Sequence, residues 1–277
     1  MEPLKVHAVR EFHSNQSDDD FRAEEIRNVG YTVIQSGLDE SELITIRAKI
    51  DSIYLQQIAE IGGEAKLQKI NDANIARALL AYDDYFLGIA AHPRIIQIAT
   101  KLLGEYFILM SQNAIVNSPS TEHYQVTWHR DLNYQHFVSS RPLAVSALFV
   151  VDEFNETTGA TRLLPASHKS EMFPSAEYVE QHEVTINAPC GSLILFDSMV
   201  FHRSGLNSSG LARRAINHIY TLPLIRQQIS FPEMLGGKYR DDPFLRKFLG
   251  YDIETAASVT DWRAQKLLLA EELQTKN

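Results

Sequence analysis

The stretch SLILFDSMVFH, residues 192–202, is one of several short apolar runs that decide the fold of this chain. Between residues 106 and 224 these runs are rich in Val, Ile, Phe, Leu and Tyr, and Gly, Pro, Asn and Ser separate them. Short strands at this spacing are typical of a β-sandwich or a β-barrel. The expected strands are YFILMSQNAIVN (106–117), HYQVTWH (123–129), LAVSALFVV (143–151), EVTINAP (183–189), SLILFDSMVFH (192–202) and RRAINHIYTLP (213–223).

Helical patterns flank this β region on both sides. We expect a helix that ends at Gly30, a strand YTVIQ (31–35), and a helix over 39–60 that Asp39 can cap. Further helices are predicted over about 71–90 and, starting at Pro93, over 93–104; a C-terminal helix is predicted over 260–274. The sequence therefore predicts a mainly β fold with flanking helices. Its predicted organisation is a flexible arm (1–20) and one domain (21–277), with helices (21–104), a β core (105–224) and a helical tail (225–277).

Composition excludes several classes of protein. The chain has 277 residues, 44% hydrophobic and 22% charged, which is typical of a globular protein rather than a disordered one. A net charge of −9 argues against nucleic acid or an anionic membrane as the main partner. No apolar run approaches the roughly 18–20 residues of a membrane span, and the first 20 residues lack the apolar core of a signal peptide. The single cysteine, Cys190, excludes an intrachain disulfide and fits a cytoplasmic location.

A candidate metal site begins in the segment TWHRDLNY, residues 127–134. His129 and Asp131 are two residues apart, so on a strand both side chains leave the same face. Such a pair is weak evidence alone, because a strand-end histidine beside a solvated carboxylate is common. His202, at the end of a second expected strand, supplies a third ligand. Two histidines and one carboxylate leave positions open on an octahedral metal and suit non-haem Fe(II), whereas structural zinc prefers four ligands, often cysteines.

An arginine pair at 213–214 follows His202 at the start of the last expected strand. An arginine inside a barrel is costly unless it pairs with an anion, and its planar guanidinium suits a carboxylate. A dicarboxylic co-substrate that chelates the metal would need such a partner at its far end. Arg214 competes for this assignment, because neighbours on a strand point to opposite faces, and both arginines lying on the surface is the plainer alternative.

Four motifs together resemble the phytanoyl-CoA dioxygenase-like family of Fe(II)/2-oxoglutarate oxygenases. They are GYTVIQSGLDESEL (30–43), WHRDLNY (128–134), NETTGATRLLPASHKS (155–170) and PCGSLILFDSMVFHRSGLNSSGLARRAI (189–216). The resemblance covers about residues 30–223. It implies a double-stranded β-helix, also called a jelly roll, with helices packed outside, which agrees with the expected strands.

The resemblance also implies site residues. The iron ligands would be His129, Asp131 and His202, and Arg213 rather than Arg214 stands where the family binds 2-oxoglutarate. Ser204 is expected to share that carboxylate, and Thr127 and Asn113 are weaker candidates for co-substrate contacts. A substrate wall is expected directly after the first two ligands, from Tyr134, His136 and Phe137.

The implied activity is hydroxylation of an unactivated C–H bond of a small metabolite, with Fe(II), 2-oxoglutarate and O₂ as cofactors and succinate and CO₂ as co-products. Desaturation, cyclisation and epoxidation share the same ligands and stay open. Related halogenases lack the carboxylate ligand, so Asp131 argues against halogenation. Outside the oxygenases, the alternatives are a metal-dependent isomerase and a non-catalytic metal-binding jelly roll that acts as a sensor. Neither the substrate nor the oligomeric state follows from the sequence.

Overall fold

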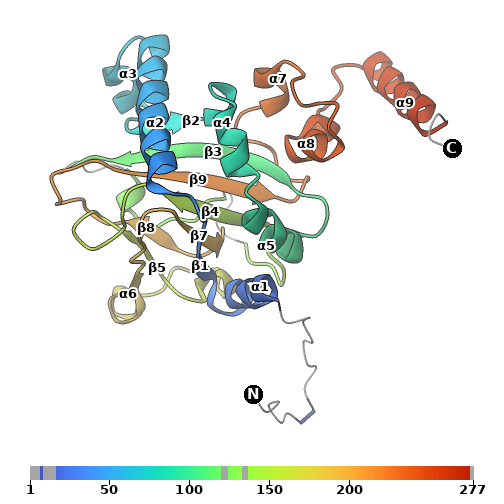
Figure 1. The fold of residues 1–277 in the computed structure, drawn as a ribbon. Coiled ribbons are helices and arrows are strands. Elements are labelled where there is room, and N and C mark those ends of the chain that lie inside the picture. The colour runs from blue at the N-terminus through green and yellow to red at the C-terminus, as the bar shows by residue number, and fades with distance from the viewer. Residues whose placement is uncertain (1–6, 9–16, 120–123, 133–136, 275–277) are drawn as a thin grey trace.

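The computed structural model describes residues 7–8, 17–119, 124–132 and 137–274. Its centre is a six-stranded antiparallel sheet in the order β1-β7-β4-β9-β3-β2 (Figure 1). The strands are β1 (Tyr31–Gln35), β2 (Ile75–Arg77), β3 (Ile108–Asn117), β4 (Ala144–Val150), β7 (Ser192–Asp197) and β9 (Arg213–Thr221). Both edge strands, β1 and β2, come from the N-terminal part of the chain. This part therefore contributes strands to the main sheet as well as helices.

A smaller sheet packs against one face of this main sheet. It has the order β6-β5-β8, from β5 (Thr161–Leu163), β6 (Val184–Thr185) and β8 (His202–Ser204). Alternate residues of the main sheet face it: on β4, Leu148 and Val150 lie in the core between the sheets, whereas Val145, Ala147 and Phe149 face the other way. The predicted pattern of two packed sheets is confirmed.

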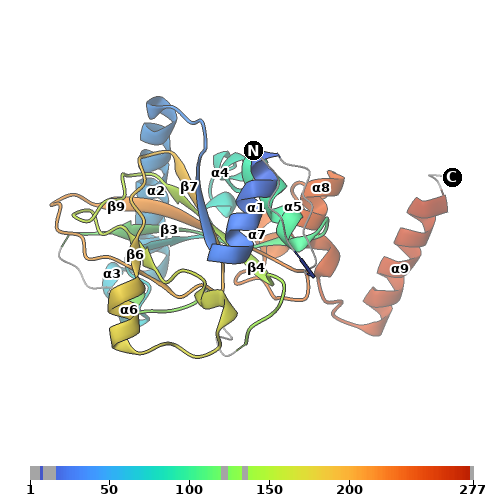
Figure 2. The same cartoon turned by 90° about the horizontal axis from the view of Figure 1, so that it is seen from below.

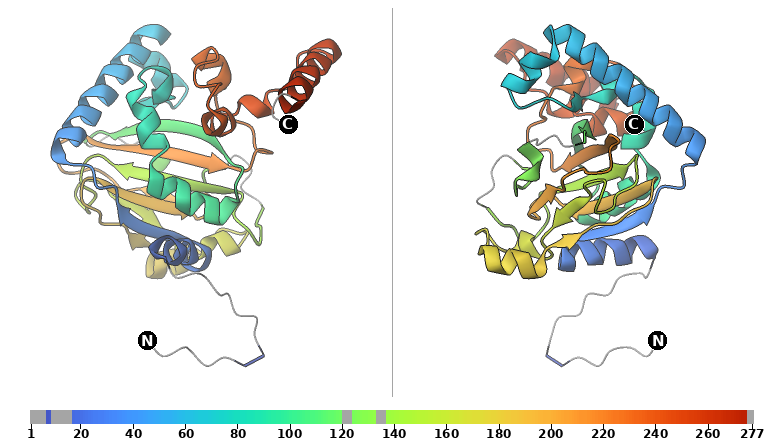
Figure 3. Two further views of the ribbon diagram at one scale, coloured as in Figure 1. Left: turned by 45° about the vertical axis from the view of Figure 1, so that its right-hand side comes forward. Right: turned by 90° about the vertical axis from the view of Figure 1, so that its left-hand side faces the viewer.

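Helices cover the opposite face of the main sheet, as the right-hand view of Figure 3 shows. The N-terminal helices are α1 (Asp18–Val29), α2 (Glu40–Ile61), α3 (Glu64–Lys69), α4 (Tyr85–Ala90) and α5 (Pro93–Leu103). As predicted, Asp39 caps α2 by accepting a hydrogen bond from the Glu42 backbone, and Pro93 starts α5. Ser17 caps α1 in the same way, so Asp18–Asp20 belong to this helix and not to the predicted arm.

The helix expected over 71–90 and the single strand expected over 192–202 were both wrong. The helix predicted over 71–90 is broken, because Asn71, Asn74 and Ala78 have left-handed backbone angles and β2 pairs with β3 between them. The strand predicted over 192–202 divides into β7 and β8, because the Asp197 side chain and carbonyl accept hydrogen bonds from Met199 and Val200 and close a turn. This turn moves the chain from the main sheet into the smaller one.

The C-terminal part contains α7 (Phe231–Leu235), α8 (Pro243–Phe248) and α9 (Val259–Gln274), and α6 (Ala176–His182) lies within the β region. Phe231 and Phe248 are buried in the helix-covered core, so α7 and α8 are part of the domain. Helix α9 extends away from the rest of the fold (Figures 1 and 2). In the described part of the chain, no helix is long and apolar enough to cross a membrane.

A fully buried histidine in β9 makes the stability of the fold depend on pH. His218 donates from Nδ1 to the Ala147 carbonyl and accepts at Nε2 from the Gln112 amide. Burial lowers its pKa to about 4, whereas an unfolded histidine titrates near 6.5. The neutral ring therefore contributes stability that is fully present above about pH 6.5 and is lost as the pH falls towards 4.

We expect this one group to remove about 2–3 kcal/mol from the free energy of unfolding between neutral pH and about pH 4.5. A His218→Gln variant keeps an amide donor and acceptor but cannot titrate there, so its pH dependence should be shallower by that amount. Denaturant titrations of both proteins at the two pH values measure the difference. Parallel pH profiles would contradict the assignment.

Candidate active site

The three predicted metal ligands converge at one end of the space between the sheets. One ligand atom from each of His129, Asp131 and His202 lies within 4.8 Å of the other two. His202 Nε2 is 3.5 Å from Asp131 Oδ1, a gap that a metal with bonds of roughly 2 Å to each ligand can bridge. The spacing therefore fits one metal ion, and the donor set suits non-haem iron.

The backbone around His129 is not the strand that the sequence predicted. Residues 124–126 form a 3-10 turn, and His129 makes only an isolated bridge with His202, with N–O distances of 3.0 Å in both directions. Asp131 donates its backbone N–H to the Ser198 carbonyl at 3.0 Å. Contacts with the turn after β7, rather than strand periodicity, bring the two ligands to the same point.

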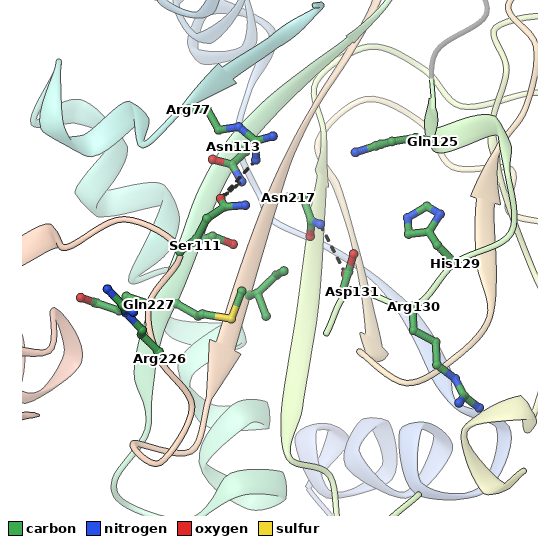
Figure 4. Close-up of a pocket in the computed structure, with 13 residues that line it drawn as sticks. Arg77, Ser111, Asn113, Gln125, His129, Arg130, Asp131, Asn217, Arg226 and Gln227 are labelled. Atoms are coloured by element: carbon green, nitrogen blue, oxygen red, sulfur yellow. Dashed lines mark hydrogen bonds between the residues drawn. The ribbon is translucent and has the colours of Figure 1, made fainter. Parts of the chain in front are cut away.

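Arg130, between the two ligands, explains the irregular backbone. Its side chain is buried and runs away from the metal position (Figure 4). It donates to the carbonyls of Met199 at 2.7 Å and Ser167 at 3.1 Å, and it stacks on Phe201. These bonds hold the segment 129–131 against the turn after β7 and against the backbone at Ser167.

Both histidine rings are oriented by hydrogen bonds through Nδ1. His129 donates to the Thr127 carbonyl at 2.9 Å, and His202 donates to the Val200 carbonyl at 3.0 Å. This pattern fixes the tautomer and assigns Nε2 of each ring to the metal. Thr127 contributes its carbonyl here, and its side chain is exposed.

Asp131 is ionised in spite of its burial. Burial raises the pKa of this carboxyl, but the neighbouring His202 and His129 rings and a hydrogen bond from Ser146 outweigh it and lower the pKa to about 2. Asp131 Oδ2 accepts from Ser146 and, at 3.4 Å, from Asn217. Burial lowers the pKa of His202, but Asp131 outweighs this effect and raises it, so a metal would compete with a proton on His202 Nε2.

Ser146 is a supporting residue that the sequence did not single out. Because partners of a ligating carboxylate typically change metal affinity by 10–100-fold, we expect Ser146→Ala to weaken Fe(II) binding by about tenfold. The control is Ser192→Ala, which removes a buried serine hydroxyl from β7 instead of β4. It should leave the Fe(II) affinity unchanged. Competition with a metal-binding dye measures both variants. Equal affinities in the two variants would show that the Ser146 hydrogen bond has no effect on the metal.

A buried arginine lies beside the metal position, as predicted. Arg213 is 3% exposed, and burial lowers its pKa to about 9. It donates to the Gly159 carbonyl at 2.8 Å and to Ser204 Oγ at 3.0 Å, and its guanidinium lies over the Phe154 ring. No ion pair to Arg213 is found in the described part of the chain, so a buried cation is left without a carboxylate partner. Arg214 is different, because it pairs with Asp51 and Asp152 on the helix side of the sheet.

Arg213 and the metal ligands line one small inner cavity. Ser204, Thr161 and Asn217 line it with them, and apolar contacts come from Ile115, Leu148 and Phe196. A bound dicarboxylate could reach the metal with one end and Arg213 with the other. Asn113, predicted to contact the same ligand, lies instead on a wider outer cavity.

The outer cavity, of about 550 Å³, opens on the other side of His129 and Asp131. Its walls come from β2, β3, β9 and the segment 226–228, and Figure 4 shows Arg226 and Gln227 across the cavity from His129. Of the predicted substrate wall, Tyr134 and His136 lie outside the described residues. Phe137 is exposed and does not line either cavity. The sequence did not single out Gln125, Asn217 or Arg226.

Comparison with known proteins agrees with this geometry. Residues 26–215 match the family model for phytanoyl-CoA dioxygenase. The uncharacterized protein Rv1501 of Mycobacterium tuberculosis is 31% identical over 75% of this chain and 77% of its own.

Among solved structures, EctD from S. alaskensis, determined with 2-oxoglutarate and 5-hydroxyectoine, aligns over 78% of this chain and 82% of its own, with a TM-score of 0.63 and 20% identity. The carbocyclase SnoK from nogalamycin biosynthesis aligns over 76% and 85%, with a TM-score of 0.57 and 18% identity. The predicted jelly-roll fold is confirmed.

Proposed function

The chain belongs to the phytanoyl-CoA dioxygenase family of non-haem iron oxygenases, whose cofactors are Fe(II), 2-oxoglutarate and O₂, and on this premise we propose that it hydroxylates an unactivated C–H bond of a small metabolite. One observation carries the proposal. A complete set of two histidines and one carboxylate shares a cavity with a buried arginine, Arg213, that has no carboxylate partner among the described residues. A metal-dependent isomerase or a structural metal site would not need that cation.

Three residues would hold the iron: His129 and His202 through Nε2, and Asp131 through its carboxylate. When bound, iron supplies the activation of O₂ and the oxidation of the C–H bond, coupled to conversion of 2-oxoglutarate into succinate and CO₂. The protein keeps the imidazoles in one tautomer through the carbonyls of Thr127 and Val200. Related halogenases lack this carboxylate and bind chloride in its place, so Asp131 favours hydroxylation over halogenation.

Arg213 and Ser204 would bind the distal carboxylate of 2-oxoglutarate. The guanidinium is already oriented by the Gly159 carbonyl and the Phe154 ring, so little side-chain entropy is lost on binding. Ser204 Oγ accepts from Arg213 and can turn its own proton to the ligand. Thr127 and Asn113 remain predictions as co-substrate contacts.

The outer cavity would receive the substrate. Asp131 and His129 line both cavities, so a molecule in the outer one lies next to the metal position without displacing the group that Arg213 holds. Apolar side chains of Ile115, Leu148 and Phe196 line the inner cavity and limit the access of water to it. A cytoplasmic location remains a prediction.

The test is spectroscopic and needs no substrate. Fe(II) and 2-oxoglutarate are added to the metal-free protein without oxygen, and the visible charge-transfer band of the chelate is recorded. We expect a band that requires both additions. Metal binding without a band would contradict the proposal and favour an isomerase or a sensor. Hydroxylation is then tested with a metabolite panel, by release of succinate and by a product mass increase of one oxygen atom.

A further inference from the structure

The outer cavity is more polar and more positive than the protein as a whole. The chain carries a net charge of −9, yet the only carboxylate among the described residues that line this cavity is Asp131, a metal ligand. Three arginines and the amides of Gln125, Asn113, Asn217, Gln227 and Gln228 make up most of its wall. Such a lining is poorly suited to an apolar substrate, because the substrate would cover these groups without hydrogen-bonding them.

The three arginines are not equivalent. Arg77 is paired with Asp72 and also donates to Gln228 at 3.1 Å, so its charge is compensated. Arg130 directs its guanidinium to backbone carbonyls away from the cavity. Arg226 has no ion pair or hydrogen bond within the part of the chain that the structure describes. It is therefore the cation that remains available to a ligand.

The backbone on both sides of Arg226 is fixed. Gln227 donates its side-chain amide to the carbonyls of Leu109 and Leu249, both at 2.9 Å, and the Gln228 backbone N–H donates to Met110 at 3.1 Å. Ile225 closes a turn onto Leu222 at 3.0 Å. The backbone of this segment is therefore held in place at the rim, so a ligand would have to order only the exposed side chain of Arg226.

Two buried polar atoms of the cavity wall have no partner among the residues that the structure describes. They are Ser111 Oγ and Asn217 Oδ1, which are inaccessible to solvent and make no hydrogen bond to those residues. Ser111 is 4% exposed. Asn217 donates its amide to Asp131, which leaves its carbonyl oxygen for a donor from elsewhere. Because buried polar atoms are rarely left unpaired, these two point to a hydrogen-bonding ligand beside the metal position.

We propose that the substrate is a small polar metabolite with an oxyanion, a carboxylate or a phosphate, that Arg226 binds at the rim, and with a hydroxyl or amino group that reaches Ser111 and Asn217. This inference rests on the proposed function, because it assigns the outer cavity to the substrate. Arg226 comes from the segment 226–228, and Ser111 and Asn217 come from β3 and β9, so contacts at both places would fix which C–H bond of the substrate faces the metal position.

The experiment titrates probes into the protein with Fe(II) and 2-oxoglutarate in the absence of oxygen. The probes are hydroxy- and amino-carboxylic acids, the primary amide of each as an uncharged control, and phosphate monoesters of matching length. Binding is followed as an increase in the unfolding midpoint. We expect at least one class of anion to bind and its uncharged control to bind about tenfold or more weakly. The carboxylate and phosphate arms identify which oxyanion the site takes.

Variants test whether Arg226 is the arginine that binds the anion. Arg226→Gln should reduce anion affinity by about tenfold or more, Arg226→Lys should keep part of it, and Arg240→Gln, at an exposed arginine outside the cavity, should leave it unchanged. All three should retain the charge-transfer band, so loss of the band would count against the proposed function and not against this inference. The inference is overturned if amides bind as well as acids, if no anion binds, or if Arg226→Gln binds anions as the natural chain does.

Discussion

An Asp131→Asn variant is expected to bind Fe(II) at least about a hundredfold more weakly than the natural chain. The substitution keeps the shape of the side chain and removes the only anionic ligand of the set. A hundredfold loss is about 3 kcal/mol, which is modest for a buried charge interaction at such short range. Titration with Fe(II) in the absence of oxygen measures the affinity, and the charge-transfer band with 2-oxoglutarate should be absent at concentrations that saturate the natural chain.

The matched control is Asp197→Asn, which changes a second buried aspartate nearby in the sequence. Asp197 accepts a hydrogen bond from the Met199 backbone, burial raises its pKa to about 6, and it lines neither cavity. We expect Fe(II) affinity to be unchanged in this variant. Equal losses in both variants would mean that the effect comes from the fold, and unchanged binding in Asp131→Asn would remove Asp131 from the ligand set.

The fold was predictable to the extent that local patterns decide it. Short apolar runs broken by Gly, Pro, Asn and Ser predicted β4 and β9, and capping by Asp39 and a proline start predicted α2 and α5, because these signals act within a few residues. The segment 71–90 was mispredicted because its conformation depends on pairing of β2 with β3, which lies more than 30 residues further along the chain. The same is true of 124–129, where His129 exchanges backbone hydrogen bonds with His202, which lies more than 70 residues further along the chain.

The site residues, too, were predictable where local patterns decide their position and not where distant contacts do. Ligand identity followed from residue types and from a family resemblance, which also chose Arg213 over Arg214. Strand alternation predicted only that the two arginines point to opposite faces, and the structure bears this out. The same alternation places Asn217 on the face of Arg213, so it could have been found from the sequence. Arg226 could not have been found from the sequence, because it lies beyond the last strand. Bonds that Gln227 and Gln228 make to β3 and to Leu249 bring it to the cavity.

Replacement of Arg213 by methionine is expected to abolish the preference for a dicarboxylic co-substrate. The natural chain should bind 2-oxoglutarate about 100–1,000-fold more tightly than 2-oxopentanoate, which has a methyl group where 2-oxoglutarate has its distal carboxylate. This ratio is about 3–4 kcal/mol, the lower part of the roughly 3–5 kcal/mol lost when one partner of a buried ion pair is removed. In Arg213→Met the ratio should fall to within about tenfold, because the variant no longer offers a cation to the carboxylate. The chelate band, titrated with each 2-oxo acid, reports both affinities.

The ratio of the affinities for the two 2-oxo acids distinguishes loss of carboxylate binding from loss of the fold. A variant that had merely lost its fold would bind neither acid, whereas loss of one ion pair weakens 2-oxoglutarate and spares 2-oxopentanoate. Arg214→Met is the control: it removes the pairs with Asp51 and Asp152 on the helix side, so stability should fall while the preference stays. If Arg213→Met kept the preference and Arg214→Met lost it, the co-substrate would have to bind on the other face of β9. The buried Arg213 guanidinium beside Ser204 would then be a structural group rather than the binding site for the distal carboxylate.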